Sequence, residues 1–288
     1  MNNPRKTTRI YFCFPDDVQS KNLKNFIDKL VEQSKENTDD EESKWGGFLG
    51  KSYLADALKN KFDNKNYEKY TTPDNKILKK IKSDTEDSLE KSRKVLPSRK
   101  RPVRVFVYPW FPGENEKVFE GVIGTTFFGS TFHLYIDTEN FSTKSLKDTT
   151  AHEYNHSVYF SYHHPFKQSI LEAVILEGLA EHFREKVIGG KPAPWSIALE
   201  KDGAVEQFKD LKEKGYLDIN MQDSNEDYWS FYEEVFYGKG SKYKQWTGHS
   251  IGYHIIEALK SASSGISWEN LIKQKPEKIL EKSRFPKS

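Results

Sequence analysis

The feature that most restricts the fold of this chain is a five-residue pattern of histidine and glutamate near its middle. Residues 149–157 read Thr-Thr-Ala-His-Glu-Tyr-Asn-His-Ser, so His152 and His156 are four positions apart. On an α-helix of 3.6 residues per turn, two residues with this spacing lie one above the other, and their imidazoles can bind a single ion. The pattern therefore predicts a helix that supplies two ligands to a metal.

Glu153 occupies the second position of this His-Glu-x-x-His pattern. It is turned by about 100° from His152 around the helix, so its carboxylate lies beside the ion, within reach of a water that the ion activates. This geometry predicts a general base. The pattern is typical of zinc peptidases, although it also occurs in other hydrolases and in helices without metal, so a third ligand must be identified.

The candidate third ligand is Glu177, which lies within a second helical pattern that includes residues 176–185. Catalytic zinc usually takes three protein ligands and leaves one position for water. Glu177 follows His156 by 21 positions, which allows the first helix to end, the chain to turn and a second helix to return beside it. Gly178 has no Cβ, so we expect these two helices to approach closely at the level of the metal.

Glu181 lies one turn beyond Glu177 on the same predicted helix face. It is placed to accept the free imidazole N–H of a ligand histidine, which would fix the tautomer of that ring. The alternative is a surface ion pair with Arg184 or Lys186. The sequence leaves both interpretations open.

His249 and Tyr253 are candidates for stabilising the charge that develops on a carbonyl oxygen during hydrolysis, because a histidine or tyrosine can donate a hydrogen bond there. They are four positions apart and share a helix face. Gly248 and Gly252 beside them would allow close packing against the metal helix. The alternatives are a helix cap for His249 and a core position for Tyr253.

Two motifs together carry a resemblance to a known group of enzymes. The His-Glu-x-x-His pattern, followed by Glu-Gly-x-Ala-Glu at residues 177–181, resembles the gluzincins. More narrowly, residues 103–256 look like the YjaZ-like family of predicted zinc-dependent proteases. The resemblance implies a zincin-like fold, Glu177 as a ligand, Glu153 as the base and a place beside the cleft for residues 248–253.

The resemblance also implies a way to bind the substrate. A strand at residues 127–137 would lie at the edge of the sheet and hold an extended peptide by backbone pairing, the alternative being an ordinary half-buried strand. Related proteases carry a tyrosine near position 249, whereas this chain has His249. The identity of the hydrogen-bond donor therefore stays open.

The remaining sequence predicts an α+β chain. Strands are expected where β-branched and aromatic residues concentrate, at residues 9–14, 103–108 and 119–137. Helices are expected at residues 22–31, 48–62, 77–96, 146–162, 167–188, 203–214, 226–237, 250–261 and 268–273. A basic, proline-bounded stretch at residues 97–102 divides a mainly helical region, residues 1–98, from a zincin-like catalytic domain, residues 99–288. In this domain, a small, mostly antiparallel sheet is expected to precede a helical half.

Composition excludes several classes of partner. Among the 288 residues, 45 basic and 43 acidic side chains give a net charge of +2, so we expect neither nucleic acid nor a membrane as a partner. The single cysteine, Cys13, excludes an internal disulfide. No apolar run approaches the length of a membrane span or of a signal-peptide core, which predicts a cytoplasmic protein.

Taken together, these features predict a zinc-dependent peptidase in which His152, His156 and Glu177 hold Zn²⁺. Glu153 would activate water to cleave a peptide bond of a peptide or protein substrate. Imidazole and carboxylate ligands would also accept cobalt, nickel or copper, so zinc is inferred from geometry. Two alternatives use the same scaffold: a zinc-stabilised peptide-binding protein without turnover, and an amidase that acts on a non-protein substrate.

Overall fold

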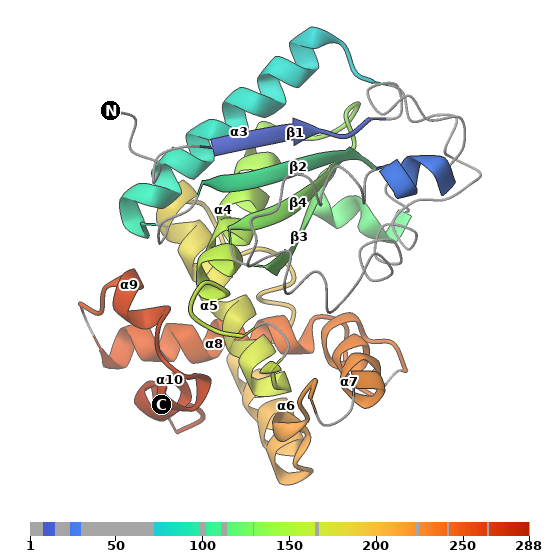
Figure 1. The fold of residues 1–288 in the computed structure, drawn as a ribbon. Helices are drawn as coiled ribbons and strands as arrows, with labels where there is room; N and C mark the ends of the chain where they lie inside the picture. The colour runs from blue at the N-terminus through green and yellow to red at the C-terminus, as the bar shows by residue number, and fades with distance from the viewer. Residues whose placement is uncertain are drawn as a thin grey trace.

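A small β-sheet and a helical half make up the computed structural model of the chain, which confirms the predicted α+β class (Figure 1). The structure describes residues 8–14, 24–29, 72–97, 102–110, 114–128, 130–164, 167–222, 225–240, 242–263 and 265–287. Helix α4 lies between the sheet and α5, and α5 in turn packs against α8. The candidate site lies where these layers meet.

The helical elements agree with the expected ones within a few residues at most ends. They are α3 (Asn75–Val95), η3 (Glu114–Phe119), α4 (Thr143–Tyr159), α5 (Ile170–Ile188), α6 (Lys201–Glu213), η5 (Tyr216–Asp218), α7 (Asn225–Tyr237), α8 (Thr247–Ala262), α9 (Trp268–Leu271) and α10 (Pro276–Ser283). The short 3-10 segments η3 and η5 and the helix α10 were not predicted. The helix expected at residues 48–62 lies outside the described residues.

Four strands form the sheet in the order β1-β2-β4-β3. They are β1 (Thr8–Phe12), β2 (Val103–Pro109), β3 (Val122–Phe128) and β4 (Thr131–Ile136). Both β1 and β4 run parallel to β2, whereas β3 runs antiparallel to β4. The prediction of a mostly antiparallel sheet is therefore wrong.

Strand direction follows from the connections between strands. Helix α3 lies in the long connection between β1 and β2, and a crossover of this kind returns the chain to the end of the sheet from which it started, as parallel pairing requires. β3 reaches β4 through a short turn, so this pair is antiparallel. The edge prediction also needs correction, because most of residues 127–137 form the interior strand β4, and the edge next to it is β3.

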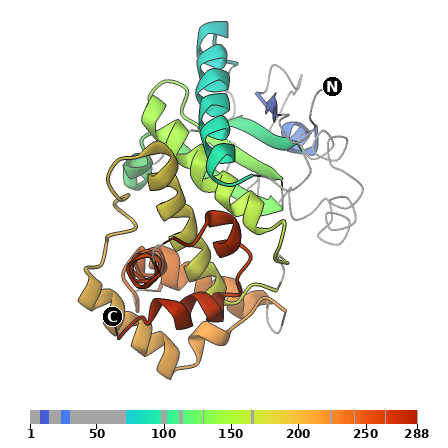
Figure 2. The ribbon, with the colours of Figure 1, turned by 90° about the vertical axis from the view of Figure 1, so that its left-hand side faces the viewer.

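One face of the sheet is covered by helices (Figure 2). Helix α4 packs against β3 and β4, and α3 packs against α4. Every residue of β2 and of β4 is buried, on both faces of the sheet. Strands buried in this way have nearly continuous apolar sequences, which is why these two were easy to predict.

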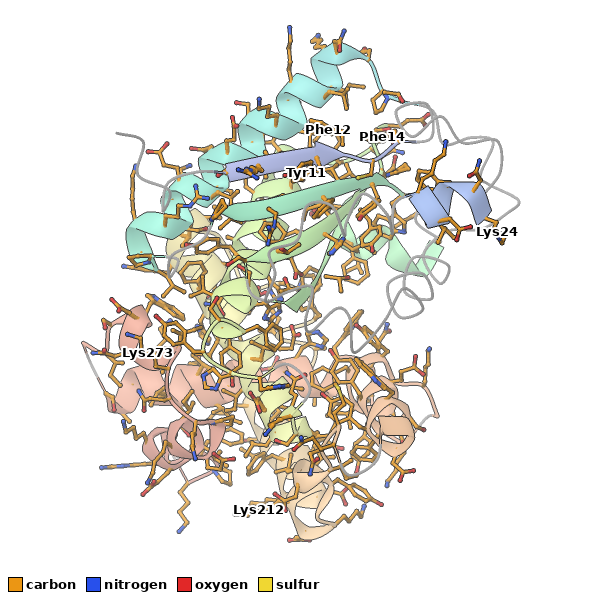
Figure 3. All side chains as sticks on the ribbon, in the orientation of Figure 1. Tyr11, Phe12, Phe14, Lys24, Lys212 and Lys273 are labelled. Atoms are coloured by element: carbon orange, nitrogen blue, oxygen red, sulfur yellow. The ribbon has the colours of Figure 1, made fainter. Side chains whose placement is uncertain are left out.

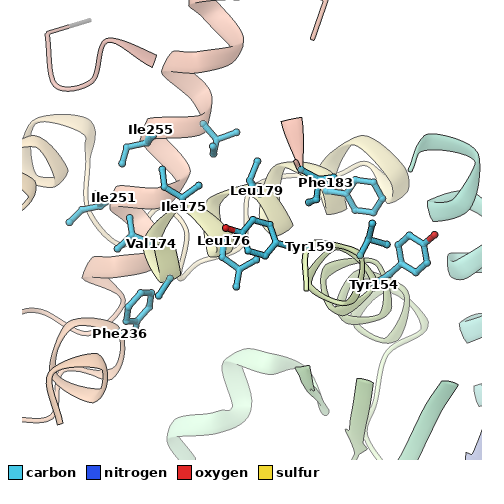
Figure 4. Packing of buried hydrophobic residues seen from close by; sticks show 14 of the residues in the cluster. Tyr154, Tyr159, Val174, Ile175, Leu176, Leu179, Phe183, Phe236, Ile251 and Ile255 are labelled. Atoms are coloured by element: carbon cyan, nitrogen blue, oxygen red, sulfur yellow. The ribbon is translucent and has the colours of Figure 1, made fainter. Parts of the chain in front are cut away.

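Helices α4, α5 and α8 share one apolar core. Ser142 and Ser169 cap the first two of these helices, each accepting a hydrogen bond from a backbone N–H three residues later, of 2.9 and 3.1 Å. Figure 4 shows Tyr159 of α4, Leu179 of α5 and Ile255 of α8 in the same cluster of buried side chains. The core thus fixes the positions of the three helices that carry the candidate site residues.

Helices α5 and α8 cross at a pair of glycines. A Cβ added at Gly178 would overlap the Gly252 carbonyl, and one added at Gly252 would overlap the carbonyl of Val174. The expected close approach at Gly178 therefore joins α5 to α8, and not α5 to α4. The prediction for α8 is corrected in the same way, because Gly252 packs against α5 and Gly248 packs against Phe236 of α7, neither of them against the metal helix.

Elements from residues 1–98 join the rest of the molecule. β1 extends the sheet by pairing with β2, α3 packs against α4, and residues 24–29 are helical within the predicted range. The boundary proposed between residues 98 and 99 remains a prediction.

Charged side chains are abundant on the outer surface. Lys24, Lys212 and Lys273 are exposed and project from its periphery (Figure 3). Several exposed lysines pair with a carboxylate one helical turn away, as Lys80 does with Asp84 at 2.8 Å. Within the described ranges, no helix combines the length and the apolar character needed to span a membrane.

Candidate metal centre

Helices α4 and α5 bring three side chains with metal-binding atoms together. His152 and His156 lie one turn apart on α4, and their Nε2 atoms are 2.9 Å apart. Glu177 of α5 faces both rings, with Oε2 at 3.3 Å from Nε2 of His152 and Oε1 at 3.6 Å from Nε2 of His156. Their side chains are 15%, 8% and 14% exposed for His152, His156 and Glu177 respectively, so the cluster is largely shielded from solvent.

The separations within this cluster fit a single tetrahedral ion. With bonds of about 2.0–2.1 Å, the ligand atoms of a tetrahedral zinc site are about 3.3 Å apart. The two Nε2 atoms are 2.9 Å apart, and each lies near a different oxygen of the Glu177 carboxylate, His152 at 3.3 Å from Oε2 and His156 at 3.6 Å from Oε1, so the three distances lie close to that value. Two imidazoles and one carboxylate are also a donor set that zinc accepts. These residues therefore fit a zinc ion.

Buried negative charge makes the cluster a favourable place for a cation. Although burial favours the neutral carboxyl, the neighbouring histidines hold the pKa of Glu177 far below its usual value. Although burial also opposes a charged imidazole, hydrogen bonds to Glu177 and Glu181 raise the pKa of His152 to about 10. A proton on His152 thus balances the carboxylates when no metal is present, and a divalent ion would replace that charge.

Glu153 points from α4 toward the sheet. Its Oε2 accepts a hydrogen bond of 2.7 Å from the hydroxyl of Thr126 in β3. Gly124, also in β3, lies against the same carboxylate, because a Cβ there would be 2.6 Å from Oε1 of Glu153. Burial raises the pKa of Glu153 to about 7. A carboxylate with such a pKa can both accept and release a proton near neutral pH.

The alternation of side chains along β3 explains how Thr126 reaches this helix. Gly124 and Thr126 are two positions apart, so both face α4, and both lie against Glu153. The pairing of β3 with β4 shifts register only beyond Thr125. Despite its orientation toward the sheet, Glu153 still offers an oxygen within 4.8 Å of ligand atoms of His152 and His156.

Glu181 makes both kinds of contact that the sequence left open. Its Oε2 lies 3.5 Å from Nδ1 of His152, and its Oε1 pairs with Arg184. Oε1 also accepts a hydrogen bond of 3.2 Å from the backbone N–H of Ala193. The residue is 2% exposed, so the ion pair lies in the interior and not on the surface. Glu181 thus links the ring of His152 to the chain that follows α5.

The structure brings His249 into the cluster and leaves Tyr253 outside it. Nε2 of His249 lies 3.6 Å from Oε2 of Glu177. Burial lowers the pKa of this imidazole, which favours its neutral form. Tyr253 instead stacks on His182 with ring centroids 4.3 Å apart, and its hydroxyl donates to Oε1 of Glu185 at 3.2 Å. Tyr253 therefore faces a part of α5 beyond Glu177.

Two residues near the cluster were not found from the sequence. Thr126 holds the Glu153 carboxylate, and Tyr237, the last residue of α7, has its ring centroid 6.4 Å from that of His249. Neither residue belongs to a motif, and their positions depend on how β3 and α7 pack against the metal helices.

A model of one protein family matches residues 81–281, which is more than half of the chain. That family is described as "Predicted Zn-dependent protease (DUF2268)". The chain belongs to this family. The matched range contains every residue of the cluster, and the zinc dependence in the family's description agrees with a group of His152, Glu153 and His156 that could hold a metal ion.

The chain is also similar to one curated protein, the uncharacterized protein YjfC of Bacillus subtilis (strain 168). The two are 23% identical over 137 residues, which are 44% of this chain and 44% of the relative. The match therefore spans less than half of the relative's length. No solved structure matches the chain.

Proposed function

We propose that the protein is a zinc-dependent peptidase in which His152, His156 and Glu177 hold the ion. The observation that carries this proposal is the meeting of a carboxylate from α5 with two imidazoles from α4, at separations suited to one tetrahedral ion. Membership of a family described as predicted zinc-dependent proteases supports it.

The proposed chemistry is hydrolysis of a peptide bond with Glu153 as the general base. Bound zinc would supply Lewis acidity, which polarises the carbonyl group and lowers the pKa of water in the site. Glu153 accepts the proton of the attacking water and passes it to the leaving nitrogen. Thr126 holds Oε2 of this carboxylate, so we assign the proton transfer to Oε1, the atom beside Gly124.

The carbonyl oxygen gains negative charge during attack and needs a hydrogen-bond donor. His249 and Tyr237 are the candidates, because both lie beside the cluster. A tyrosine has a pKa of about 10, so Tyr237 keeps its proton at neutral pH and can donate a hydrogen bond. Tyr253 receives no role, because its hydroxyl donates to Glu185.

The edge strand β3 would align the substrate. An extended peptide can add to the edge of a sheet through backbone hydrogen bonds. β3 is the edge strand that also contacts Glu153 through Gly124 and Thr126. A peptide paired with β3 would therefore lie close to the general base.

The proposal separates two kinds of variant. Glu153→Gln should keep near one zinc per chain and lose turnover, because it removes the base and no ligand. Glu177→Ala should lose zinc. Elemental analysis of the purified proteins, paired with cleavage of an unfolded protein with and without a chelator, measures both effects. Glu206→Ala is the matched control, since Glu206 is an exposed glutamate of α6.

The results distinguish the proposed peptidase from the other interpretations. Normal turnover by Glu153→Gln would contradict the assigned base. Zinc bound by the wild type without cleavage of any unfolded protein would favour a peptide-binding protein or an amidase with a non-protein substrate. Absence of metal from a well-folded wild type would remove the main support for the proposal.

A further inference from the structure

The exposed large hydrophobic residues in the described part of the chain lie on segments whose aromatic rings are in contact. These residues are Val118, which is 37% exposed, Ile197 at 48% and Tyr237 at 45%. They belong to three different segments, namely η3, the connection between α5 and α6, and the end of α7. Each of these segments also contributes an aromatic ring to a common cluster. Exposed apolar surface of this kind marks a place where something binds.

We call this cluster the aromatic patch and define it as Phe119, Trp195, Trp246 and Tyr237. Phe119 lies 5.3 Å from Trp195 and 5.7 Å from Trp246, measured between ring centroids. Trp246 lies 5.9 Å from Tyr237 and 6.4 Å from Trp195. Phe119, Trp195 and Trp246 are half-buried, so their rings are not fully enclosed by the described fold. The patch therefore presents partly open aromatic surface.

The aromatic patch is continuous with the candidate metal centre. The ring of Trp246 packs edge-on against His249 at 5.3 Å, and Tyr237 lies 6.4 Å from the same ring. His249 in turn contacts Glu177 at 3.6 Å. Two consecutive contacts, from a ring of the patch to His249 and from His249 to Glu177, thus lead from the aromatic patch to the proposed zinc ligand.

Backbone strain fixes one member of the patch. Trp246 has a φ of 72° and a ψ of 12°, which is the left-handed region that a bulky side chain rarely adopts. It stands immediately before α8, three residues from His249, and its backbone N–H donates to the carbonyl of Phe236 at 3.1 Å. Strained residues cluster at binding sites and active sites, where the surrounding structure holds them.

We infer that the aromatic patch is a subsite that binds a bulky apolar side chain of the substrate, next to the scissile bond. This inference rests on the proposed peptidase function and adds the substrate class to it. None of the four rings carries a charge, so the patch favours aromatic or large aliphatic side chains over acidic or basic ones. A second protein is a poorer fit for the patch, because a stable protein interface buries about 800 Å² per partner. Four neighbouring rings offer a surface suited to a single side chain.

The test combines cleavage with a binding measurement that needs no turnover. A random-sequence peptide library is digested by the zinc-loaded wild type, and mass spectrometry identifies the residues on both sides of each cleaved bond. Two peptides that carry Phe or Ala at the preferred position are then titrated into zinc-loaded Glu153→Gln by calorimetry. Trp195→Ala and Phe119→Ala, each made alone and on the Glu153→Gln background, remove one wall of the patch at a time. Trp229→Ala, a half-buried tryptophan of α7 that packs on Tyr228 and Tyr232, is the matched control.

We expect the wild type to prefer Phe over Ala at one position by on the order of 100-fold in kcat/KM. Trp195→Ala and Phe119→Ala should each lower this ratio to about 10-fold or less, and Trp229→Ala should keep it. In the binding measurement, the Phe peptide should bind Glu153→Gln more tightly than the Ala peptide does, and Trp195→Ala or Phe119→Ala on that background should reduce this difference. Circular dichroism and zinc content identify any variant that has lost its fold.

The outcomes that overturn the inference differ from those that overturn the peptidase. Cleavage without preference for a bulky apolar residue, or a preference unchanged in both patch variants, would refute the subsite and leave the peptidase intact. Selective binding of the Phe peptide without any cleavage would refute turnover and support the subsite. Absence of both cleavage and selective binding would overturn the inference as well.

Discussion

Replacing Gly124 with alanine should disable the proposed general base, Glu153, while leaving the proposed metal ligands in place. An added Cβ at this position would lie 2.3 Å from Cγ, 2.6 Å from Oε1 and 2.7 Å from Cδ of Glu153. Carbon atoms pack best at about 3.5–4.0 Å, so the carboxyl group must move by about 1 Å or β3 must shift by as much. Displacement of a reacting group by 1 Å can lower the rate by about 100-fold.

The assay for Gly124→Ala is kcat/KM on a peptide substrate, together with the zinc content and the melting temperature. We expect a loss of about 100-fold in kcat/KM with near one zinc per chain, because His152, His156 and Glu177 are not displaced. Overpacking of this kind also costs about 1–3 kcal/mol of stability. Gly203→Ala in α6 is the control, since an added Cβ there meets its nearest neighbour at 3.9 Å.

Two results would refute this reasoning. Full activity of a folded, zinc-loaded Gly124→Ala protein would show that the position of the Glu153 carboxylate beside β3 has no part in turnover. Loss of zinc from the same variant would show that β3 supports the metal and not the base. The activity of Gly203→Ala should equal that of the wild type in either case.

Two further predictions concern stability. Gly252→Ala should lower the melting temperature and weaken zinc binding, because its Cβ would overlap the carbonyl of Val174 in α5, the helix that carries Glu177. An unchanged melting temperature and zinc affinity would mean that α5 and α8 can separate freely. Hydrogen bonds from Lys147 and Lys91 lower the pKa of Asp87 in the folded protein. The ionised carboxylate therefore stabilises the fold above its unfolded pKa of about 3.9, and this stabilisation is lost as the pH falls through the lower, folded pKa. Denaturant unfolding of wild type and Asp87→Asn should therefore differ by up to about 1 kcal/mol at pH 7 and converge in acid, and a difference that persists in acid would contradict this account.

Local patterns in the sequence were sufficient for most helices and strands, since periodicity and β-branched composition depend on near neighbours. The helix α10 was missed because it is short and highly charged, although Pro276 at its first turn is a helix-start signal. Strand direction was predicted wrongly because it depends on the path of the connections. No property of β2 or β4 alone specifies that they run parallel.

The candidate site was predictable to the extent that its residues share a helix turn or a motif. The spacing of His152 and His156 is sufficient to place them together, and Glu177 lies in a second motif. His249 and Tyr253 share a helix face, but one turn of helix advances by about 5.4 Å, which carries the tyrosine past the cluster to Glu185.

The residues that were missed depend on tertiary packing. Tyr237 approaches the cluster because α7 packs against α8, and Thr126 does so because β3 packs against α4 with Thr126 on the side that faces the helix. Neither of these packing contacts between elements produces a local pattern in the sequence. Sequence motifs alone therefore identify the proposed ligands and the proposed base but not the groups that surround them.

The crossing of α5 and α8 at two glycines has a mechanical consequence. Where side chains separate two helices, a change of rotamer can absorb a small movement, but at Gly178 and Gly252 the main chains touch directly. Glu177 is next to this contact, so its backbone is stiff and cannot follow a moving substrate. Glu153 is held in a different way, because Thr126 donates a hydrogen bond of 2.7 Å to its Oε2 and the main chain of β3 at Gly124 lies against its side chain. The proposed ligand Glu177 is thus fixed through a contact between main chains, whereas the proposed base Glu153 is fixed through contacts of its side chain, so a substitution in β3 can move the base without moving the ligand.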